Sequence, residues 1–533
     1  MRQLKVAAGI VTLCACAGSA WAQWVVDATV NTPVATGSGD QTSQVMRASQ
    51  DGGAWIAYVD GSLGTGLKHA IQRLSATGVR SIVPATVLSP GRTNAAAFTF
   101  DMRADSAGGA IVAFDNNGIF AQRVGANGAT VWPTGGVQIT SNAASLGPRV
   151  AALVDGSYVV AWNATGAITM QRVSASGALG TSFTINNAGN YVAISDLLPG
   201  ENPGEVIALW VIGDATTASV SRRGLRMQKW NAANTPMWNA VSPSIIYTPQ
   251  ASPLKSIQNG YFPTMIPDGS GGAIVTWYDT GTTRNAWLQA VSSTGQLRFA
   301  VEGLAMSSTP ANVELRLGSS VAYDRASDSF VVAYLRSDPN QTNFGISAQR
   351  VAGNVPEWGG GAGQSIAPLT AQQVSFVTVN DAPGEDVVLS WLQADIGQSL
   401  RARAVRLNAL GETVWIPSPI GVALASTPKG RWSATNTVGS SMLIASWVDG
   451  TFGAADIKAQ NILPSGLLGP GCDSIDFNEN AVFPEDQDVI DFFNVLAGGF
   501  CDTCGDIDFN NNGVYPEDQD VIDFFNVLAG GGC

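Results

Sequence analysis

The pattern of hydrophobic positions in residues 23–466 is dominated by one short strand that recurs along the chain. Its form is Gly-Gly-Ala-Ile-Val-Ala-Phe, an apolar run that ends in an aromatic residue, here called the anchor. The eight anchors are Tyr58, Phe114, Trp162, Trp210, Trp277, Tyr334, Trp391 and Trp447. Their spacings are 56, 48, 48, 67, 57, 57 and 56 residues, which indicates eight copies of one unit.

Each unit continues after a turn into a second strand that carries Gln-Arg and an aliphatic residue, as in Gln72-Arg73-Leu74 and Gln349-Arg350-Val351. A turn with Gly follows, as in Ser176-Gly177, and several units then contain a Trp. These are Trp132, Trp238, Trp358 and Trp415. Alternating apolar runs separated by Gly, Asn, Asp and Ser predict three or four antiparallel strands per unit.

Repeats of this length and strand content predict an all-β fold, an eight-bladed β-propeller over residues 23–466. The eighth unit stops at Leu467 without a Trp strand, whereas residues 23–26, Gln-Trp-Val-Val, form a strand with no unit of its own. We expect this strand to complete the last blade, with Trp24 in the place that Trp132 and Trp415 hold elsewhere. Seven blades with a separate sheet, or two smaller propellers, are the alternatives.

The repeat resembles the Gly-Gly-x-Ile-Val-x-Trp-x-Asp propeller repeats of many secreted bacterial proteins. That family is defined by its fold, so the resemblance implies no substrate.

The chain changes character at residues 472–533, which follow a linker at 467–471. Two nearly identical copies lie 32 residues apart, each a polar loop followed by Pro-Glu-Asp-Gln-Asp-Val-Ile-Asp-Phe-Phe-Asn-Val-Leu-Ala-Gly-Gly. Pro and acids in the first turn, apolar residues at helical spacing and a final Gly pair predict a helix. The first copy has its apolar face at Val489, Phe492, Phe493 and Leu496, and the second at Val521, Phe524, Phe525 and Leu528. We expect the two faces to be buried against each other.

The same 62 residues also differ from the rest of the chain in their charge. They contain 14 Asp and Glu and no Lys or Arg, whereas the remaining 27 acidic residues of the chain nearly balance its 28 basic ones. The net charge of −13 therefore resides in this tail. Such a concentration of like charge is unfavourable unless cations neutralise it. A chain without a basic patch and with this acidic tail is not expected to bind nucleic acid.

The spacing of oxygen-bearing residues in both loops matches the first half of an EF-hand, in which positions 1, 3 and 5 offer side chains and position 7 a backbone carbonyl. We therefore predict two Ca²⁺ sites. The ligands of the first are Asp476, Asn478, Asn480, Val482 and Asp488; those of the second are Asp508, Asn510, Asn512, Val514 and Asp520.

The acid that closes each loop is open at this stage. Position 12 is Gln487 or Gln519, so either Asp488 and Asp520 close a loop that is one residue longer, or Asp486 and Asp518 close it. Ala481 stands where the second copy has Gly513, and a left-handed turn costs Ala on the order of 1 kcal/mol. We expect the second site to bind Ca²⁺ more tightly.

These residues resemble a dockerin-type module, a tandem of calcium loop and helix that fastens secreted bacterial proteins to cohesin-bearing partners. The resemblance implies a cohesin-like or cell-surface partner, and it maps the docking contacts at loop positions 10 and 11 onto Glu485, Asp486, Glu517 and Asp518. These are acids in place of the usual small hydroxyl residues.

The tail also holds Cys472, Cys501, Cys504 and Cys533, which allow three disulfide pairings. The repeat favours Cys472 with Cys501 and Cys504 with Cys533, because each bridge then closes one loop and helix. The rival interpretation is a Cys501-Asp502-Thr503-Cys504 redox pair.

Residues 1–22 have the form of a signal peptide: Arg2 and Lys5, an apolar run to Cys16, and Ala20-Trp21-Ala22 before Gln23. We expect an extracellular protein, which agrees with disulfides, and no later stretch is apolar enough to span a membrane. Leu13-Cys14-Ala15-Cys16 also loosely resembles a lipoprotein box, which instead places the protein on a membrane through lipid on Cys16.

Catalytic chemistry has little support along the propeller. The single histidine, His69, is expected to be structural, and the arginines of the Gln-Arg pairs occupy equivalent places, which indicates a structural repeat. Four acids follow their anchors closely and are expected to be turn residues: Asp60, Asp115, Asp279 and Asp449.

Function is therefore predicted as that of a secreted, non-catalytic protein whose propeller offers a binding face to a glycan or a protein and whose tail binds Ca²⁺ and docks to a partner or surface. The alternative is a carbohydrate-active hydrolase on the same scaffold, recognised by two or three acids in a deep pocket. A third reading takes the tail as an export or anchoring tag only.

Overall fold

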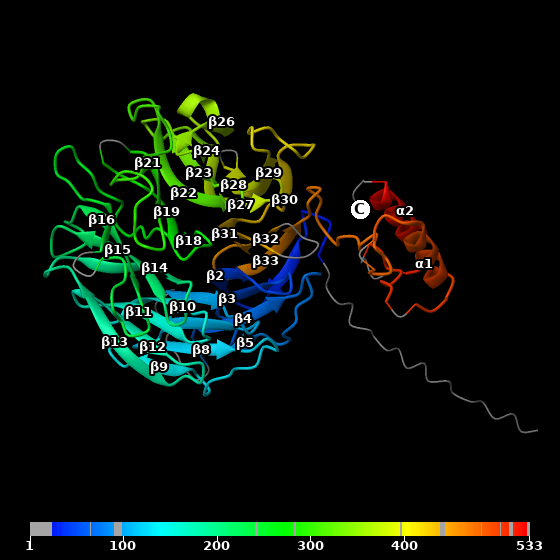
Figure 1. Cartoon of the computed structure of the whole chain (residues 1–533), viewed down its shortest axis with the longest axis horizontal. Coiled ribbons are helices and arrows are strands. Elements are labelled where there is room, and N and C mark those ends of the chain that lie inside the picture. Colours follow the sequence, from blue (N-terminus) through cyan, green and yellow to red (C-terminus); the bar gives the residue numbers. More distant parts are fainter. Residues whose placement is uncertain are drawn as a thin grey trace, which may run out of the picture.

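The structure is a computed structural model that describes residues 24–63, 66–89, 99–239, 243–281, 284–394, 397–437, 443–480, 482–501, 503–510 and 515–529. The predicted leader lies outside these ranges. Eight antiparallel sheets surround one axis, and in each sheet the strand that precedes the anchor-bearing strand lies nearest that axis (Figure 1). The prediction of an eight-bladed propeller is confirmed.

The first four blades are each a four-stranded meander, in the order of the chain. Blade 1 consists of β2 (Gln41–Ala48), β3 (Ala54–Asp60), β4 (Lys68–Leu74) and β5 (Thr86–Val87). Blade 2 consists of β6 (Phe100–Ala104), β7 (Ala110–Asp115), β8 (Ile119–Val124) and β9 (Val137–Thr140). Blade 3 consists of β10 (Leu146–Ala152), β11 (Tyr158–Ala164), β12 (Ala167–Val173) and β13 (Leu179–Asn186). Blade 4 consists of β14 (Val192–Pro199), β15 (Val206–Gly213), β16 (Arg223–Trp230) and β17 (Ser244–Tyr247).

The other four blades repeat the meander, with a fifth strand in blade 6 and the N-terminal strand as the fourth strand of blade 8. Blade 5 consists of β18 (Met265–Pro267), β19 (Ala273–Tyr278), β20 (Ala286–Val291) and β21 (Leu304–Ala305). Blade 6 consists of β22 (Leu315–Asp324), β23 (Ser329–Ser337), β24 (Phe344–Ala352), β25 (Val355–Pro356), the 3₁₀ turn η1 (Trp358–Gly361) and β26 (Gln364–Thr370). Blade 7 consists of β27 (Gln373–Ala382), β28 (Asp386–Ala394), β29 (Arg401–Leu407) and β30 (Ile420–Ala423). Blade 8 consists of β31 (Lys429–Asn436), β32 (Leu443–Asp449), β33 (Asp456–Ile462) and β1 (Thr32–Ala35).

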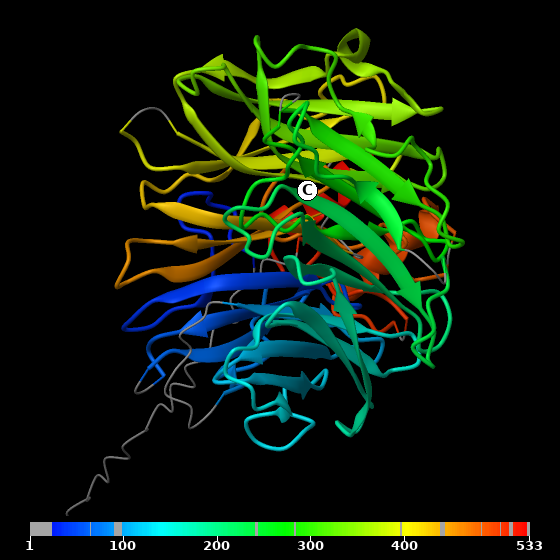
Figure 2. The ribbon, with the colours of Figure 1, turned by 90° about the vertical axis from the view of Figure 1, so that its left-hand side faces the viewer.

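Ring closure joins the two ends of the propeller. Strand β1 pairs antiparallel with β33, with Thr32 opposite Ala459, so the first strand of the chain completes the last blade. Both ribbon views place the blue first strands beside the orange last ones (Figures 1 and 2). Closure by the N-terminal segment is confirmed, but the paired strand is Thr32–Ala35 and not residues 23–26. Residues 24–31 instead form an irregular segment with a turn, in which Asn31 donates to Val422 O and Gln460 Oε1.

Trp24 takes the place predicted for it. Its indole Nε1 donates to Ala76 O at 2.6 Å, in the turn between the third and fourth strands of blade 1. Four other tryptophans make the same bond to the corresponding turn of the next blade. They are Trp132 to Ala175 O, Trp238 to Ser293 O, Trp358 to Ala409 O and Trp415 to Pro464 O.

A glycine with positive φ in each of these turns packs against the Trp of the preceding blade, for example Gly78 against Trp24 and Gly466 against Trp415. A Cβ at either position would collide with the indole ring. The Gly turn and the Trp therefore recur together because they form one contact between blades.

The Gln of each Gln-Arg pair bonds within its own blade, and the Arg contacts a neighbouring blade. Gln122 joins β8 to the segment that precedes β9 in the same blade, because its Oε1 accepts from Trp132 N and its Nε2 donates to Pro133 O. Gln349 bonds to Trp358 in a similar way, accepting from its N–H and donating to its carbonyl oxygen. The neighbouring arginines reach outward, and Arg172 donates to Gly204 O and Asn231 O of the next blade. The prediction that these arginines are structural is confirmed.

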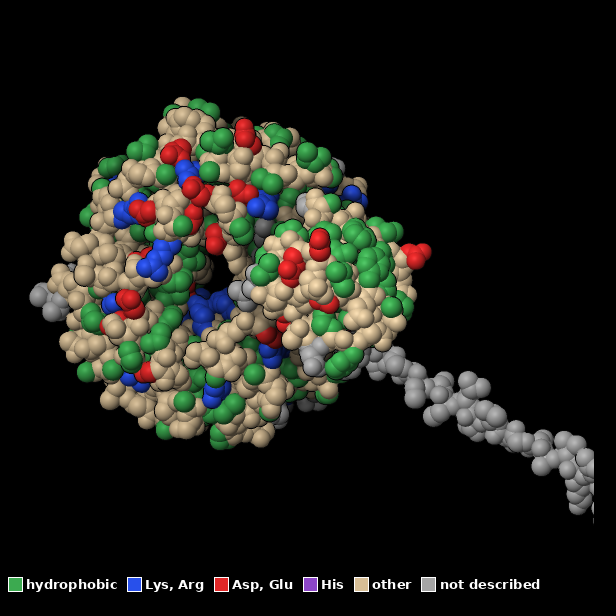
Figure 3. Space-filling model, turned by 45° about the vertical axis from the view of Figure 1, so that its right-hand side comes forward, with side chains coloured by type: hydrophobic (Ala, Val, Ile, Leu, Met, Phe, Trp, Pro, Cys, Tyr) green, Lys and Arg blue, Asp and Glu red, His purple; other side chains and the backbone are tan. Residues whose placement is uncertain are grey.

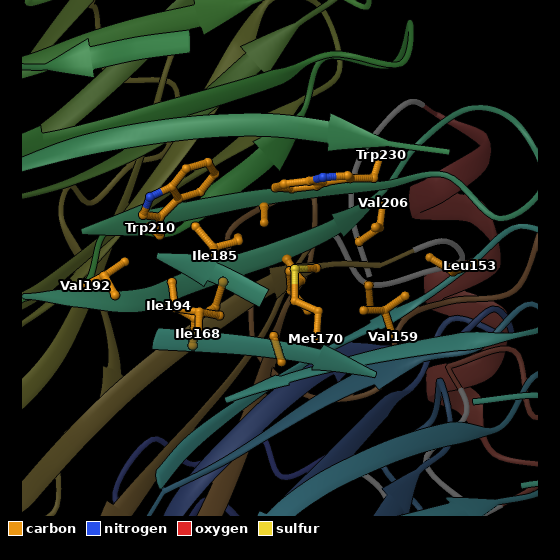
Figure 4. Close-up of a cluster of buried hydrophobic side chains, with 14 residues drawn as sticks. Leu153, Val159, Ile168, Met170, Ile185, Val192, Ile194, Val206, Trp210 and Trp230 are labelled. Carbon is orange, nitrogen blue, oxygen red and sulfur yellow. The ribbon is translucent and has the colours of Figure 1, made fainter. Parts of the chain in front are cut away.

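All eight anchors are buried, at 5% exposure or less, on the second strand of their blades. The innermost strands place one apolar residue per blade opposite the position two before the anchor, and these residues fill the spaces between blades. They are Met46, Met102, Val150, Leu197, Met265, Val321, Val379 and Ala434. Figure 4 shows the cluster between blades 3 and 4, where Trp210 and Trp230 pack over Ile168 and Met170.

The tail holds the only α-helices of the described residues, α1 (Asp486–Leu496) and α2 (Asp518–Leu528). Neither is long and apolar enough to cross a membrane, and nor is any other described helix.

Replacing Trp24 by Ala is expected to lower the free energy of unfolding by about 3–5 kcal/mol, because it empties the contact that closes the ring. Trp24→Phe keeps most of the packing and loses the hydrogen bond to Ala76 O, at a cost of about 1 kcal/mol. Urea denaturation measures both. The control is Trp287→Phe, because the Trp287 indole N–H has no partner among the described residues. Equal losses in Trp24→Phe and Trp287→Phe would contradict the role of the hydrogen bond.

Candidate functional site

The two tail units pack as an interlocked pair. Phe492 of α1 and Phe524 of α2 stack with ring centroids 4.2 Å apart, and Phe477 and Phe509 from the two loops meet them edge-on. All four rings are at 1% exposure or less. Backbone bonds cross between the units, from Asp473 N to Phe509 O and from Gly505 N to Phe477 O.

The expected helix faces are therefore buried only in part. Val489, Leu496 and their counterparts are partly buried against the ring cluster, whereas Phe493 and Phe525 remain 41% and 42% exposed. The reason is that Phe477 and Phe509 fill the centre of the interface and leave Phe493 and Phe525 at its edge, 6.0 Å from each other.

The expected disulfide pairing is wrong. Cys501 is bonded to Cys504, and Cys472 is disulfide-bonded as well, while Cys533 lies outside the described residues. The two bonded cysteines lie in the connection between the units, and the loop Phe of each unit contacts both helices. The Cα atoms of Cys501 and Cys504 lie 5.4 Å apart there.

The first loop turns its side-chain oxygens toward its own interior. Asp476 Oδ1 and Asn478 Oδ1 both accept from Asn480 N, at 3.0 and 3.2 Å. Asn480 Oδ1 accepts from Val482 N at 2.7 Å, and Asp488 Oδ1 accepts from Phe477 N at 2.9 Å. Four of the five predicted ligands thus point their oxygens at the same loop backbone.

The second loop is described up to Asn510 and again from Tyr515, so the predicted ligands Asn512 and Val514 lie outside the described residues, as does Gly513. Asp508, Asn510 and Asp520 are 7%, 8% and 0% exposed. Asp520 Oδ1 accepts from Asn510 N at 3.5 Å and Oδ2 from Glu517 N at 3.2 Å, as Asp488 does from Asn478 and Glu485 in the first loop.

Of the two acids proposed to close each loop, only one faces it. Asp488 and Asp520 are fully buried and bonded to loop backbone, whereas Asp486 and Asp518 are exposed on the first turn of their helices. Neighbouring carboxylates affect the pKa of Asp520. Burial raises its pKa above the usual range, and the charges on Asp508 and Glu517 add to this rise.

The ligands predicted from the sequence did not include two further acids at the site. Asp491 Oδ2 accepts from Asn478 Nδ2 at 3.0 Å, and Asp523 Oδ2 accepts from Asn510 Nδ2 at 3.1 Å. The repeated Asp-Val-Ile-Asp carries the signal, because its two acids are one helical turn apart and face the same loop.

The donor set fits a hard cation. Among the described residues no three His, Cys, Asp or Glu side chains form a metal-binding group. In each loop, however, two carboxylates are joined by amide oxygens, which are oxygen ligands of the kind that Ca²⁺ takes. The tail has no Lys or Arg to neutralise them. The residues present therefore fit Ca²⁺ better than they fit an internal salt bridge.

His69 is structural, as predicted. It is 1% exposed, packs against Phe100 and Phe114, and its two ring nitrogens have no hydrogen-bond partner among the described residues. Burial lowers its pKa to about 4. A neutral imidazole without a partner does not belong to a Ser-His-Asp triad.

The acids that follow the anchors are bonded within their own turns and strands. Asp60 accepts from Ser62 N and Asp279 from Asn285 N, at 2.7 Å each. Asp115 accepts from the Thr99 hydroxyl, and Asp449 lies 3.2 Å from Lys429 Nζ. Asp60 and Asp279 are turn residues that accept from backbone N–H groups, as expected, whereas Asp115 and Asp449 bond to side chains.

An acidic pocket of about 570 Å³ lies between the ends of blades 6, 7 and 8. Asp324, Asp381 and Glu385 line it, together with Asn436. Burial raises the pKa of Asp381, whereas a hydrogen bond from Ser327 lowers that of Asp324. These are the carboxylates on which the hydrolase alternative depends.

The comparisons with known proteins identify no activity for this chain. No family model and no curated protein matches the chain. Among solved structures, an endo-arabinase from Bacteroides thetaiotaomicron has 13% identity and a TM-score of 0.29 over 47% of this chain and 88% of its own. A PL25 ulvan lyase has 8% identity and a TM-score of 0.40 over 82% and 96%. A protein of unknown function from Dyadobacter fermentans has 9% identity and a TM-score of 0.38, over 81% of this chain and 97% of its own. Likenesses this weak carry no argument about function.

Asp115→Asn is expected to change how stability depends on pH. Burial raises the pKa of Asp115 from 3.8 to about 6, so the native state holds this proton more tightly than the unfolded chain. Stability then falls as pH rises from 4 to 6. The Asn variant should equal the wild type at pH 4 and exceed it by about 1–2 kcal/mol at pH 7. Denaturation at pH 4, 5, 6 and 7 measures this; parallel curves for the two proteins would contradict it.

Proposed function

We propose that this is a secreted, non-catalytic binding protein, in which the propeller holds a ligand and the tail binds two Ca²⁺ ions and docks the protein to a partner. The observation that carries the proposal is the duplicated loop in which a fully buried carboxylate, Asp488 or Asp520, bonds to the backbone that carries the other oxygen ligands.

In the first loop the ion would be held by the side chains of Asp476, Asn478, Asn480 and Asp488 and by the carbonyl of Val482. In the second it would be held by Asp508, Asn510, Asn512, Asp520 and the carbonyl of Val514. Bound Ca²⁺ supplies positive charge that offsets carboxylate repulsion in a module whose core is four Phe rings and little more.

Docking is supported by apolar side chains that both copies leave in solvent at the same positions. They are Phe483 and Tyr515, Ile490 and Ile522, and Phe493 and Phe525, all at 41% exposure or more. Asp486 and Asp518 are exposed close to them in sequence. A partner surface with an apolar centre and basic residues around it is complementary to this module. The dockerin resemblance agrees with such a role.

The acidic pocket supports a second candidate, a carbohydrate-active hydrolase that uses Asp324 and Asp381. Environments that move two carboxyl pKa values in opposite directions are typical of acid and base pairs. Hydrolysis of a plant or algal polysaccharide panel that is lost in Asp381→Asn favours this candidate over the binding protein.

Asp508→Ala is expected to remove one of two Ca²⁺ sites, because it deletes a carboxylate from the second loop only. Calorimetry on the mature full chain should count two ions for the wild type and one for the variant. Chelator should lower the melting temperature of the wild-type tail. A count of two in the variant contradicts the ligand assignment, and a count of zero in the wild type leaves the tail as an export or anchoring tag.

Asp520→Asn should weaken the second site about 10–100-fold, since it neutralises the acid that faces the loop. Asp518→Asn is the matched control, because it removes the same charge from the same helical turn but from an exposed side chain. Its Ca²⁺ affinity should stay within about twofold. The reverse order of effects, measured by calorimetry, would show that Asp518 closes the loop.

A further inference from the structure

Three arginines from successive blades come together on the innermost strands. They are Arg47 on β2, Arg103 on β6 and Arg149 on β10. Arg103 bonds to Asp101 Oδ1 at 2.9 Å and to Asp196 Oδ1 of blade 4 at 2.6 Å, and Arg47 Nη2 lies 3.5 Å from the same oxygen of Asp101. Arg47, Asp101, Arg103 and Asp196 thus form one continuous chain of charges.

Register shows that this chain faces the axis of the ring. Arg103 belongs to blade 2 and bonds to blade 4, so it passes the inner edge of blade 3. Met102, between Asp101 and Arg103, and Met46, before Arg47, are buried against the preceding blade. Side chains alternate along a strand, so Asp101 and Arg149 lie on the opposite face and reach the innermost strand of the next blade. Figure 3 shows Lys and Arg atoms lining the central opening of the ring.

The cluster has one more positive charge than negative charges. Three guanidinium groups face two carboxylates, Asp101 and Asp196, which are themselves bonded to Val150 N and Met265 N. Desolvation by the surrounding protein lowers the pKa of Arg47 to about 10 although 37% of its side chain remains exposed, and the charge on Arg103 contributes to the decrease. Uncompensated positive charge in a confined site is unfavourable, and an anion relieves it.

Two of the arginines have capacity left for such an anion. Arg47 keeps 37% of its side chain exposed. Arg149 donates from Nε to Ser195 O and from Nη1 to Pro148 O, and its Nη2 has no hydrogen-bond partner among the described residues. Arg103 is fully engaged in ion pairs, so we assign it the role of holding the cluster together.

The opposite side of the ring is uncharged at the same register. Where blades 2, 3 and 4 have Asp101, Arg149 and Asp196, blades 6, 7 and 8 have hydroxyl residues. These are Ser320, Thr378 and Ser433, all partly exposed. One wall therefore suits a single negative charge, and the other suits groups that exchange hydrogen bonds with hydroxyls.

We propose that the central opening binds a uronic acid residue of an acidic polysaccharide, with its carboxylate on Arg47 and Arg149 and its hydroxyl groups toward the uncharged wall. A planar carboxylate matches the fork of an arginine, and a monoanion matches the single excess charge. This names the ligand class of the propeller in the proposed binding protein and rests on that proposal only for the absence of hydrolysis. It does not involve the Ca²⁺ loops.

Calorimetry with trigalacturonate and triglucuronate on the mature full chain tests the proposal, and the methyl esters of the same trimers are the uncharged controls. The acids should bind at least about tenfold more tightly than the esters. Arg47→Gln should weaken binding at least about tenfold, and Arg149→Gln should do the same. Arg47→Lys keeps the charge without the fork and should fall between the wild type and Arg47→Gln.

Arg401→Gln is the matched control, because Arg401 is an exposed arginine on β29, the third strand of blade 7, and not on an innermost strand. It should bind like the wild type, and so should Asp508→Ala, which separates this site from the Ca²⁺ sites. Circular dichroism and melting temperature confirm that each variant is folded. Equal affinity for acid and ester, equal affinity of the wild type and both Arg→Gln variants, or no binding of either trimer at millimolar concentration overturns the proposal.

Discussion

Every part of the propeller depends on contacts between neighbouring blades. A single four-stranded blade has two apolar faces and cannot bury both alone, so it is stable only between two others. Here the recurring contact is specific. A Trp indole from one blade packs on a glycine turn of the next and donates to its backbone, at five of the eight interfaces. Trp24 makes this contact for blade 8, so the ring closes by the same interaction that builds it.

Closure also explains why the axis of the ring can carry charge. The apolar layer at Met46, Met102 and their counterparts packs against the preceding blade. The alternate positions face the next blade at the inner end of the interface, where Asp101 accepts from Val150 N and Asp196 from Met265 N. Blades 1 to 4 use these positions for arginine and aspartate, and the ion pairs among them cross three blade boundaries. The same alternation that buries the core therefore creates a polar axis in which a ligand can be selected by charge.

The balance of forces that stabilises the tail differs from that of the propeller. Its apolar core consists of four packed Phe rings, and its sequence has 14 acids with no basic residue to oppose them. A module this small has little hydrophobic stabilisation to set against repulsion. Its buried Asp488 and Asp520 are held by backbone N–H groups of the loops. Ca²⁺ in the proposed sites would replace those weak bonds with direct charge neutralisation.

The structure decided that the eight units form one ring of eight blades. The sequence by itself determined the eight repeat units, the strand that holds each anchor, the structural role of the arginines in the Gln-Arg pairs and the place of Trp24 in the last blade. These follow from periodicity, because a repeat of local pattern dictates the same local structure each time. Only the tertiary structure decided that Thr32–Ala35 is the closing strand, that Cys501 bonds to Cys504, and that Asp488 and Asp520 face the loops. It alone brought together Arg47, Arg103 and Arg149, which are 56 and 46 residues apart in the chain. Such pairings depend on how units are placed in space, and residues far apart in the chain carry no local signal that they will meet.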